Sequence, residues 1–392
     1  MSVEAGQPSL LAIFTRFLRF GLLAWGGPVA QIAIIKRELV EEEQWLTPER
    51  FNRLLAVYQV LPGPEAHELC VHLGMMKRGR LGGILAGLGF MLPGFILVLA
   101  LAWLYQRLDL QQPAFAAVLL GVQIGVIALI VRAVHRIGEH VLVDPWLWAA
   151  GIASAAGSWL GVSFWIILPA AGLFYAAAAS RRYVLAAAIA LLGLALAAWM
   201  ASGIPVRGPG TVVAASASAT ALFLSGLKAG LLTFGGAYTA IPFVRNDAVG
   251  RGWVSDGQFL DSLALSGIIP APLIIFATFI GYLAGGFAGA LAITAGIFLP
   301  AFGFGLLFYD RLEHVIENAR LHQFLEGVAA GVVGLIAITA LQLGWNVVRS
   351  LPSLALGEAI FAASLGLLYL WKSKLNVLAV VGASAAAGAL AF

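Results

Sequence analysis

The sequence predicts an all-α polytopic membrane protein with about 13 transmembrane segments, arranged as two inverted-topology repeats with broken helices. Three observations predict this fold: the composition, the succession of long apolar stretches, and an ordered internal duplication. Of the 392 residues, 61% are hydrophobic and only 11% are charged, and the mean hydropathy is +0.94. Soluble domains carry about 25% charged residues, so lipid must be the solvent for most of this chain.

Composition and missing motifs exclude several functions. The net charge of +4 is small, so no nucleic-acid partner is expected. The single cysteine, Cys70, excludes an internal disulfide and a cysteine metal cluster. The chain has no G-x-x-x-x-G-K phosphate loop, no H-E-x-x-H and no G-x-S-x-G. We therefore expect no cofactor, no resident metal and no enzymatic activity, and membrane lipid as the surroundings.

The apolar stretches are long enough to define candidate spans, since a helix needs about 20 residues to cross a bilayer. The N-terminal stretch lacks a preceding basic region, so it is expected to be a retained helix and not a signal peptide. The thirteen predicted spans lie near residues 10–26, 54–76, 84–105, 113–131, 146–161, 162–180, 183–201, 213–234, 259–284, 287–308, 323–346, 353–371 and 375–392.

The duplication is an ordered series of matches. FLRFGLLAWGG at 17–27 returns as GLKAGLLTFGG at 226–236, and LPGP at 61–64 returns as IPAP at 269–272. We place the first copy at 1–206 and the second at 207–392. In a membrane chain, duplicated segments interrupted by glycine and proline predict a transport site where the two copies meet.

The distribution of basic residues predicts the orientation, because cytoplasmic loops carry an excess of Lys and Arg. An inner-membrane protein with thirteen spans and a cytoplasmic N-terminus places five clusters on the cytoplasmic side and the acidic segment 38–43 outside. Seven spans precede the second copy, so the copies are expected to be inverted. The five clusters are Lys77–Arg78–Arg80, Arg132–Arg136, Arg181–Arg182, Arg311–Arg320 and Lys372–Lys374.

Two cations lie inside matching spans. Arg19 and Lys228 each stand seven residues before the first glycine of a pair, which is about 10 Å along a helix. A cation at membrane depth usually faces the bundle interior or a water-filled cavity. We predict that this pair binds an anionic substrate, and the alternative is that the side chains reach the headgroups.

Glycine pairs and proline motifs follow each cation. Paired glycines leave backbone N–H groups accessible, and short half-helices at 28–36 and 237–244 would point a positive dipole end at an anion. Each Pro-x-Pro motif is expected to interrupt its helix around a cavity. The alternatives are close helix packing and simple kinks, and only kinks are expected at Pro93 and Pro300. The predicted substrate-binding residues in these motifs are Gly26, Gly27, Pro62, Gly63, Pro64, Gly235, Gly236, Pro270 and Pro272.

An acidic and histidine-containing group follows the first proline motif alone. Glu65, Glu68 and His72 share one helix face, and such groups can change protonation near neutral pH. They are candidates for proton coupling. The alternative is a polar helix end beside the basic segment 77–80.

The chain resembles the chromate ion transporter family in its long, two-domain form. The resemblance is carried by FGLLAWGGPVAQ at 20–31 with AGLLTFGGAYTA at 229–240, by the Trp and Phe of 45–51 and 253–259, and by LPGP with IPAP. It implies an inner-membrane carrier that exports chromate and confers chromate resistance, with binding residues in the glycine pairs and in Pro62–Pro64. The second copy departs from the pattern, because Ala271 replaces the central glycine.

Two other functions stay open at this point. The substrate could be sulfate or another tetrahedral oxyanion, since chromate and sulfate share shape and charge. The chain could instead be a membrane enzyme acting on a lipid phosphate, with the Glu65–His72 group at an interface. Small residues throughout the spans allow a homodimer without requiring it.

Overall fold

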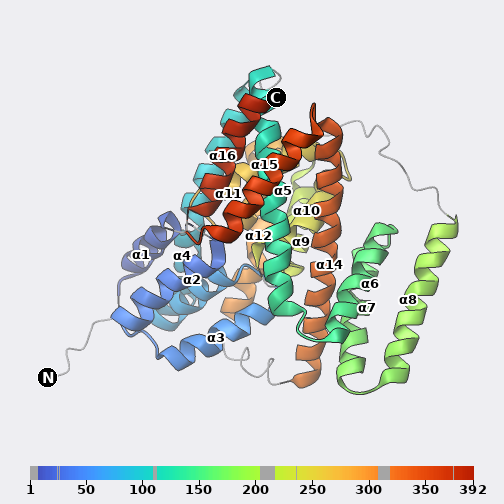
Figure 1. The fold of residues 1–392 in the computed structure, drawn as a ribbon. Coiled ribbons are helices and arrows are strands. Elements are labelled where there is room, and N and C mark those ends of the chain that lie inside the picture. The colour runs from blue at the N-terminus through green and yellow to red at the C-terminus, as the bar shows by residue number, and fades with distance from the viewer. Residues whose placement is uncertain are drawn as a thin grey trace.

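The structure is a computed structural model that describes residues 8–392 apart from 24, 26, 109–112, 204–216, 235, 308–317 and 374. The described parts contain helices and no strand, which confirms the all-α prediction (Figure 1). The α-helices are α1 (Leu10–Leu22), α2 (Gly27–Ile35), α3 (Pro48–Val60), α4 (Glu65–Arg107), α5 (Pro113–Val141), α6 (Pro145–Trp159), α7 (Phe164–Ala179), α8 (Tyr183–Gly203), α9 (Ala219–Leu231), α10 (Ile241–Ala248), α11 (Asp256–Gly267), α12 (Phe276–Leu307), α14 (Ala319–Ser350), α15 (Leu354–Leu370) and α16 (Asn376–Ala391). Three short elements are the π-helical η1 (Lys36–Glu42) and the 3₁₀ turns η2 (Ala237–Ala240) and η3 (Leu273–Ile275).

Within the described residues, four segments are long and apolar enough to cross a membrane: Glu65–Arg107, Phe115–Val141, Leu273–Leu307 and Ala319–Ser350. Five shorter apolar helices accompany them, among them Phe164–Ala179 and Leu354–Leu370. With this many apolar helices in one chain, the protein is a multi-pass membrane protein.

Side-chain caps fix where several helices begin. Ser9 and Ser218 accept hydrogen bonds from the first backbone N–H groups of α1 and α9. Ser255 and Gln258 form a capping box at the start of α11. A cap satisfies backbone donors that have no partner within the helix, so matching serines start α1 and α9 at matching places in the two copies.

Two predicted spans are not continuous helices. Residues 54–76 are divided at LPGP, where α3 ends at Val60 and α4 begins at Glu65. Residues 259–284 are divided at IPAP, between the end of α11 at Gly267 and the start of η3. Proline removes a backbone donor and clashes with the preceding turn, so these motifs break the helices. Pro93 and Pro300, by contrast, lie inside α4 and α12, as predicted.

α4 and α12 each fold back on themselves as a hairpin. The turns have nearly the same backbone angles: Gly79 has φ 61° and ψ −158°, and Gly286 has φ 61° and ψ −154°. The two arms touch closely, because a Cβ on Gly74 would lie 2.4 Å from the carbonyl oxygen of Gly82. Only glycine adopts this backbone region readily. The two copies therefore contain the same turn at Gly79 and Gly286.

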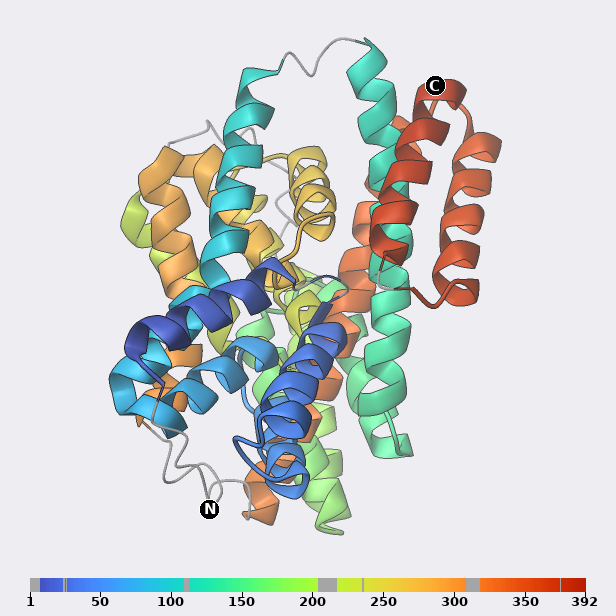
Figure 2. The same cartoon turned by 90° about the vertical axis from the view of Figure 1, so that its left-hand side faces the viewer.

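The second arm of each hairpin is crossed by the first helix of its copy. A Cβ on Gly21 of α1 would lie 2.4 Å from the Phe90 carbonyl oxygen on α4. A Cβ on Gly230 of α9 would lie 2.4 Å from the Ile297 carbonyl oxygen on α12. Small residues allow membrane helices to approach this closely. Figure 2 shows α1 lying across the tall second arm of α4.

The later helices of the two copies are exchanged. α6 and α7 follow α5 in the chain, yet they pack against α14. α15 and α16 follow α14, yet they pack against α5 (Figure 1). α5 and α14 also contact each other, and α4 contacts α12. Each copy therefore completes the packing of the other.

α5 differs from its predicted boundaries in a way that matters for function. The sequence placed Arg132 and Arg136 in a loop after a span ending at residue 131. In the structure α5 continues to Val141, and both arginines lie within the apolar span Phe115–Val141. An arginine inside a span is costly unless it faces protein or water, so these two side chains become candidates for a site.

Candidate functional site

Arg19 and Lys228, the two predicted anion-binding cations, each form an ion pair at a corresponding position. Arg19 Nη2 lies 3.0 Å from Glu38 Oε1, and Lys228 Nζ lies 2.5 Å from Asp247 Oδ2. In both copies the acid follows the cation by nineteen residues. The repeat therefore preserves a pair of opposite charges and not a cation alone.

The ion pairs change the interpretation of both partners. The side chain of Glu38 is only 7% exposed, and it lies in the π-helical η1 and not in a loop. The side of the membrane on which this segment lies stays a prediction. Lys228 is 13% exposed, whereas Arg19 is 61% exposed. Each cation is already paired with a carboxylate, so an oxyanion would compete with that carboxylate for the positive charge.

The glycine turns differ between the copies. Gly26 and Gly235 fall outside the described residues. Gly27 begins the nine-residue helix α2, which agrees with the half-helix expected at 28–36. Gly236 has φ 119° and is followed by η2 and α10, so a short helical segment also begins near 237.

The first proline break contacts the second glycine turn. The backbone N–H of Gly63 donates to the carbonyl oxygen of Thr233, 2.8 Å away. Gly63 has φ 151°, a conformation that favours glycine. Ala271, at the matching position of the second copy, does not have a positive φ. The two breaks therefore have different backbones, and the first break contacts the other copy through the Gly63 N–H.

The group that follows LPGP is buried inside the protein. Glu65 is 8% exposed, Glu68 0% and His72 3%, and the neighbouring His67 is also fully buried. His72 Nδ1 lies 2.8 Å from the Tyr58 hydroxyl. Both carboxyl oxygens of Glu68 are buried without a hydrogen-bond partner. The described residues offer no cluster of three or more such side chains that could hold a metal ion.

A basic pocket of about 580 Å³ lies between the two glycine turns. Pro28, directly after the first glycine pair, and Tyr238, shortly after the second, both line it. Ala271 of the IPAP break and Ser266 of α11 line it as well. The pocket therefore joins both copies at the motifs from which the sequence predicted a binding site.

Three cations face this pocket, and its described lining contains no carboxylate. Arg132 and Arg136 come from α5, and Lys372 comes from the segment before α16. Arg132 stacks over the Tyr369 ring at 4.5 Å, and its Nη1 is buried without a hydrogen-bond partner. Ser266 is 1% exposed, and its hydroxyl is also without a partner. Unpaired donors around a cationic pocket are suited to a small anion.

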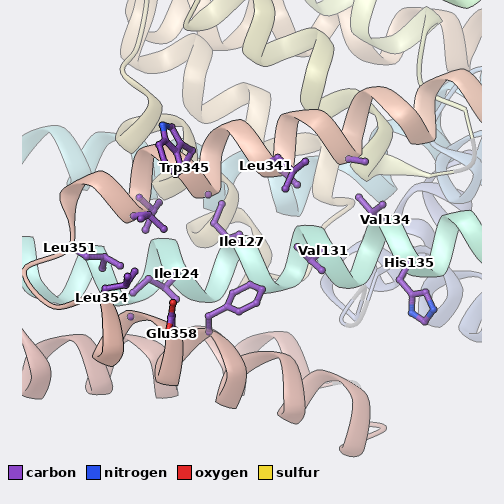
Figure 3. A pocket seen from close by; sticks show the side chains of 17 residues that line it. Ile124, Ile127, Val131, Val134, His135, Leu341, Trp345, Leu351, Leu354 and Glu358 are labelled. Carbon is purple, nitrogen blue, oxygen red and sulfur yellow. The ribbon is translucent and has the colours of Figure 1, made fainter. Parts of the chain in front are cut away.

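A second cavity has the opposite character. It measures about 660 Å³ and lies between α5, α14 and α15 (Figure 3). Aliphatic side chains such as Ile124, Ile127 and Leu341 form most of its walls, and Glu358 is its one carboxylate. No arginine or lysine belongs to its described lining. A dianion would be repelled by Glu358 and would meet no cation among these residues, so the basic pocket is the better candidate for an anion site.

Sequence reasoning missed several members of this site. None of the residues predicted to bind substrate lines the basic pocket, although four pocket residues are their direct neighbours in the chain: Pro28, Ile269, Ala271 and Leu273. Arg132 and Arg136 were recognised only as orientation signals. The signal that could have found them is their position, because two arginines one helical turn apart at the end of an apolar run need a polar partner.

Comparison with known proteins agrees with the duplication. The model of the chromate transporter family matches this chain twice, at residues 11–222 and 220–389. A chromate transport protein of Pseudomonas aeruginosa is 62% identical over all of this chain and 95% of its own length. A chromate transport protein of Cupriavidus metallidurans is 31% identical over 96% of this chain and 92% of its own. No solved structure matches the chain.

These matches decide between the function classes. The matched relatives are transport proteins, and the family is a family of transporters and not of enzymes. The membrane enzyme considered from the sequence is therefore set aside. This chain belongs to the chromate transporter family.

Proposed function

We propose that this chain is a secondary carrier that exports chromate across the inner membrane and thereby confers chromate resistance. The relatives named as chromate transport proteins support the substrate. The basic pocket between the two glycine turns is the observation that carries the proposal. It offers three cations, unpaired buried donors and no carboxylate in its described lining.

The chemistry of the pocket fits a tetrahedral dianion. Arg132 and Arg136 are separated by four residues, so their guanidinium groups leave the same face of α5. A guanidinium can bind two oxygens of one oxyanion, and such charge-assisted hydrogen bonds are roughly twice as strong as neutral ones. Ser266 and Tyr238 can then donate from the opposite wall. The first turn of α2 adds its positive dipole end, since Pro28 and Ala30 line the pocket.

The carrier works by alternating access between two inverted repeats, with a cytoplasmic N-terminus. Equal hairpin turns at Gly79 and Gly286 and equal helix crossings at Gly21 and Gly230 support a common architecture for the two copies. The seven predicted spans before the second copy support opposite orientations. Rocking of one inverted repeat against the other around a central site is the usual mechanism of such carriers.

In this proposal Arg19 and Lys228 bind the anion transiently along the transport pathway, and the glycine and proline motifs lie on the same pathway. Both cations are paired with carboxylates at rest, so they bind the anion in competition with those carboxylates. The flanking motifs supply the flexible backbone at the crossing of the two copies: Gly26, Gly27, Pro62, Gly63, Pro64, Gly235, Gly236, Pro270 and Pro272.

The membrane potential drives the export of a dianion. Moving one charge is worth about 2.3 kcal/mol per 100 mV, so a dianion gains about 4.6 kcal/mol per 100 mV on leaving an inside-negative cell. Glu65, Glu68 and His72 remain candidates for proton coupling, and their burial near Gly63 supports the proposal. Sulfate has the same shape and charge as chromate, and it is the main alternative substrate.

A flux assay in everted membrane vesicles tests the proposal. Uptake of chromate, sulfate and molybdate is measured under an imposed potential, positive inside the vesicle, with vesicles lacking the protein as the control. We expect chromate uptake well above the control, and a larger uptake of sulfate would assign the alternative substrate. If no oxyanion enters faster than in control vesicles, the proposed function is wrong.

A further inference from the structure

Asp261 is a further buried carboxylate, and the proposed function does not use it. Asp261 is in α11, is 3% exposed, and accepts two hydrogen bonds. The Tyr105 hydroxyl on α4 donates to Oδ2 at 2.7 Å, and the Gln123 amide on α5 donates to Oδ1 at 3.0 Å. One carboxyl group thus joins three helices.

No cation neutralises this carboxylate among the described residues. The buried carboxylates of Glu38 and Asp247 each form a salt bridge with a Lys or Arg. In the part of the chain that the structure describes, Asp261 forms none. A buried charge without a counter-ion is costly. A bound proton removes that cost, and Asp261 has the geometry to accept one, because Tyr105 can reverse its hydroxyl and accept a hydrogen bond.

The surroundings of Asp261 contain few other titratable groups. η3 and α16 pack against α11 and contain none, and α12 contains only Tyr282. On α4 the nearest charged residue in sequence to Tyr105 is Arg107, which stacks over Trp103. On α5 the charged residues begin at Arg132, about 14 Å along the helix from Gln123. The protonation state of Asp261 therefore depends mainly on Tyr105, Gln123 and burial.

Two of the three joined helices also build the basic pocket. Asp261 and the pocket residue Ser266 are five residues apart on α11, about 7.5 Å along its axis. Gln123 is on α5, which carries Arg132 and Arg136. A change in the hydrogen bonds of Asp261 thus acts on the contact between two walls of the pocket.

We propose that Asp261 is a proton-binding site whose occupancy sets the position of α11 against α5, so that a proton moves inward as the oxyanion is exported. This inference rests on the proposed function. The ionised carboxylate accepts from both Tyr105 and Gln123 and holds the three helices together. The protonated carboxyl must itself donate, so at least one of these two hydrogen bonds is rearranged and the contact of α11 with α4 or α5 changes.

The test uses the full-length protein in everted vesicles, with chromate as the probe. Chromate uptake is measured under a potential alone and with an acidic vesicle lumen added, for the wild type and for Asp261→Asn. The amide keeps the shape and cannot bind a proton at this pH. We expect the acidic lumen to stimulate the wild type roughly threefold or more, and Asp261→Asn to keep potential-driven uptake but lose this stimulation.

Three further variants make the result decisive. Glu358→Gln, an acid-to-amide change in the apolar cavity, should keep the stimulation. Glu68→Gln tests the other candidate for coupling, and loss of stimulation there but not in Asp261→Asn would overturn the inference. If Asp261→Asn is poorly produced, Tyr105→Phe should shift the pH dependence of the stimulation, and an unshifted dependence would contradict the proposal. Absence of chromate uptake by the wild type would instead refute the proposed function.

Discussion

Lys228 Nζ lies 2.5 Å from Asp247 Oδ2, and the first copy holds Arg19 and Glu38 in the same relation. The second pair is the more buried, with the two side chains 13% and 5% exposed. Lys228 also lies 5.1 Å from the Phe164 ring centroid. This pair ties α9 to α10 directly behind the second glycine turn.

Removal of one partner of this pair should destabilise the protein. Asp247→Asn leaves a buried ammonium group unpaired, and such losses cost about 3–5 kcal/mol. The double variant Lys228→Gln with Asp247→Asn should recover much of the loss, because it leaves no buried charge. The measurement is the midpoint of thermal unfolding in detergent.

A matched control is Arg251→Gln. Arg251 reaches the other oxygen of Asp247 at 3.5 Å from a side chain that is 55% exposed, so its loss should cost about 1 kcal/mol or less. Equal stability of Asp247→Asn and the wild type would show that the pair does not hold α9 against α10.

The hairpin turns should depend on glycine. Gly79 and Gly286 have φ near 61° and ψ near −155°, and other residues pay about 1–3 kcal/mol in such conformations. Gly79→Ala and Gly286→Ala should each lower the unfolding midpoint although no atom lies within 4 Å of either new Cβ. Gly303→Ala, in equally open space inside α12, should leave the unfolding midpoint unchanged. Equal effects at the three positions would rule out backbone strain as the cause.

The helix crossings should depend on glycine for a different reason. A Cβ on Gly226 would lie 2.2 Å from the Ile293 carbonyl oxygen, and a backbone atom cannot turn away as a side chain can. Gly226→Ala should therefore cost about 1–3 kcal/mol by overpacking. Gly366→Ala on α15 meets no atom within 4 Å and serves as the control. Unchanged unfolding of Gly226→Ala in detergent would mean that α9 and α12 do not cross this closely.

The local features of the fold could be predicted from the sequence. Apolar runs predicted the helices, and the proline motifs predicted breaks at LPGP and IPAP. These features depend on backbone chemistry near each residue, so they can be read without tertiary structure. The exact bounds, such as the extension of α5 to Val141, depend on packing and were missed.

The site was predicted less well because it is assembled from distant segments. Arg132, Ser266 and Lys372 meet only after the copies exchange their later helices. No local pattern reports that exchange. The partners of Arg19 and Lys228 could have been predicted from the sequence. The offset of 209 residues that relates the two cations also relates Glu38 to Asp247.

The central claim is that the oxyanion binds between Arg132 and Arg136, and chromate uptake into everted vesicles by Arg132→Gln with Arg136→Gln tests it most directly. Arg349→Gln is the control, because Arg349 stacks over Trp345 on α14 away from the pocket. At equal amounts of membrane-inserted protein, we expect the double variant to lose roughly 10- to 100-fold in uptake and the control to keep the wild-type rate. Wild-type uptake by the double variant would contradict the claim.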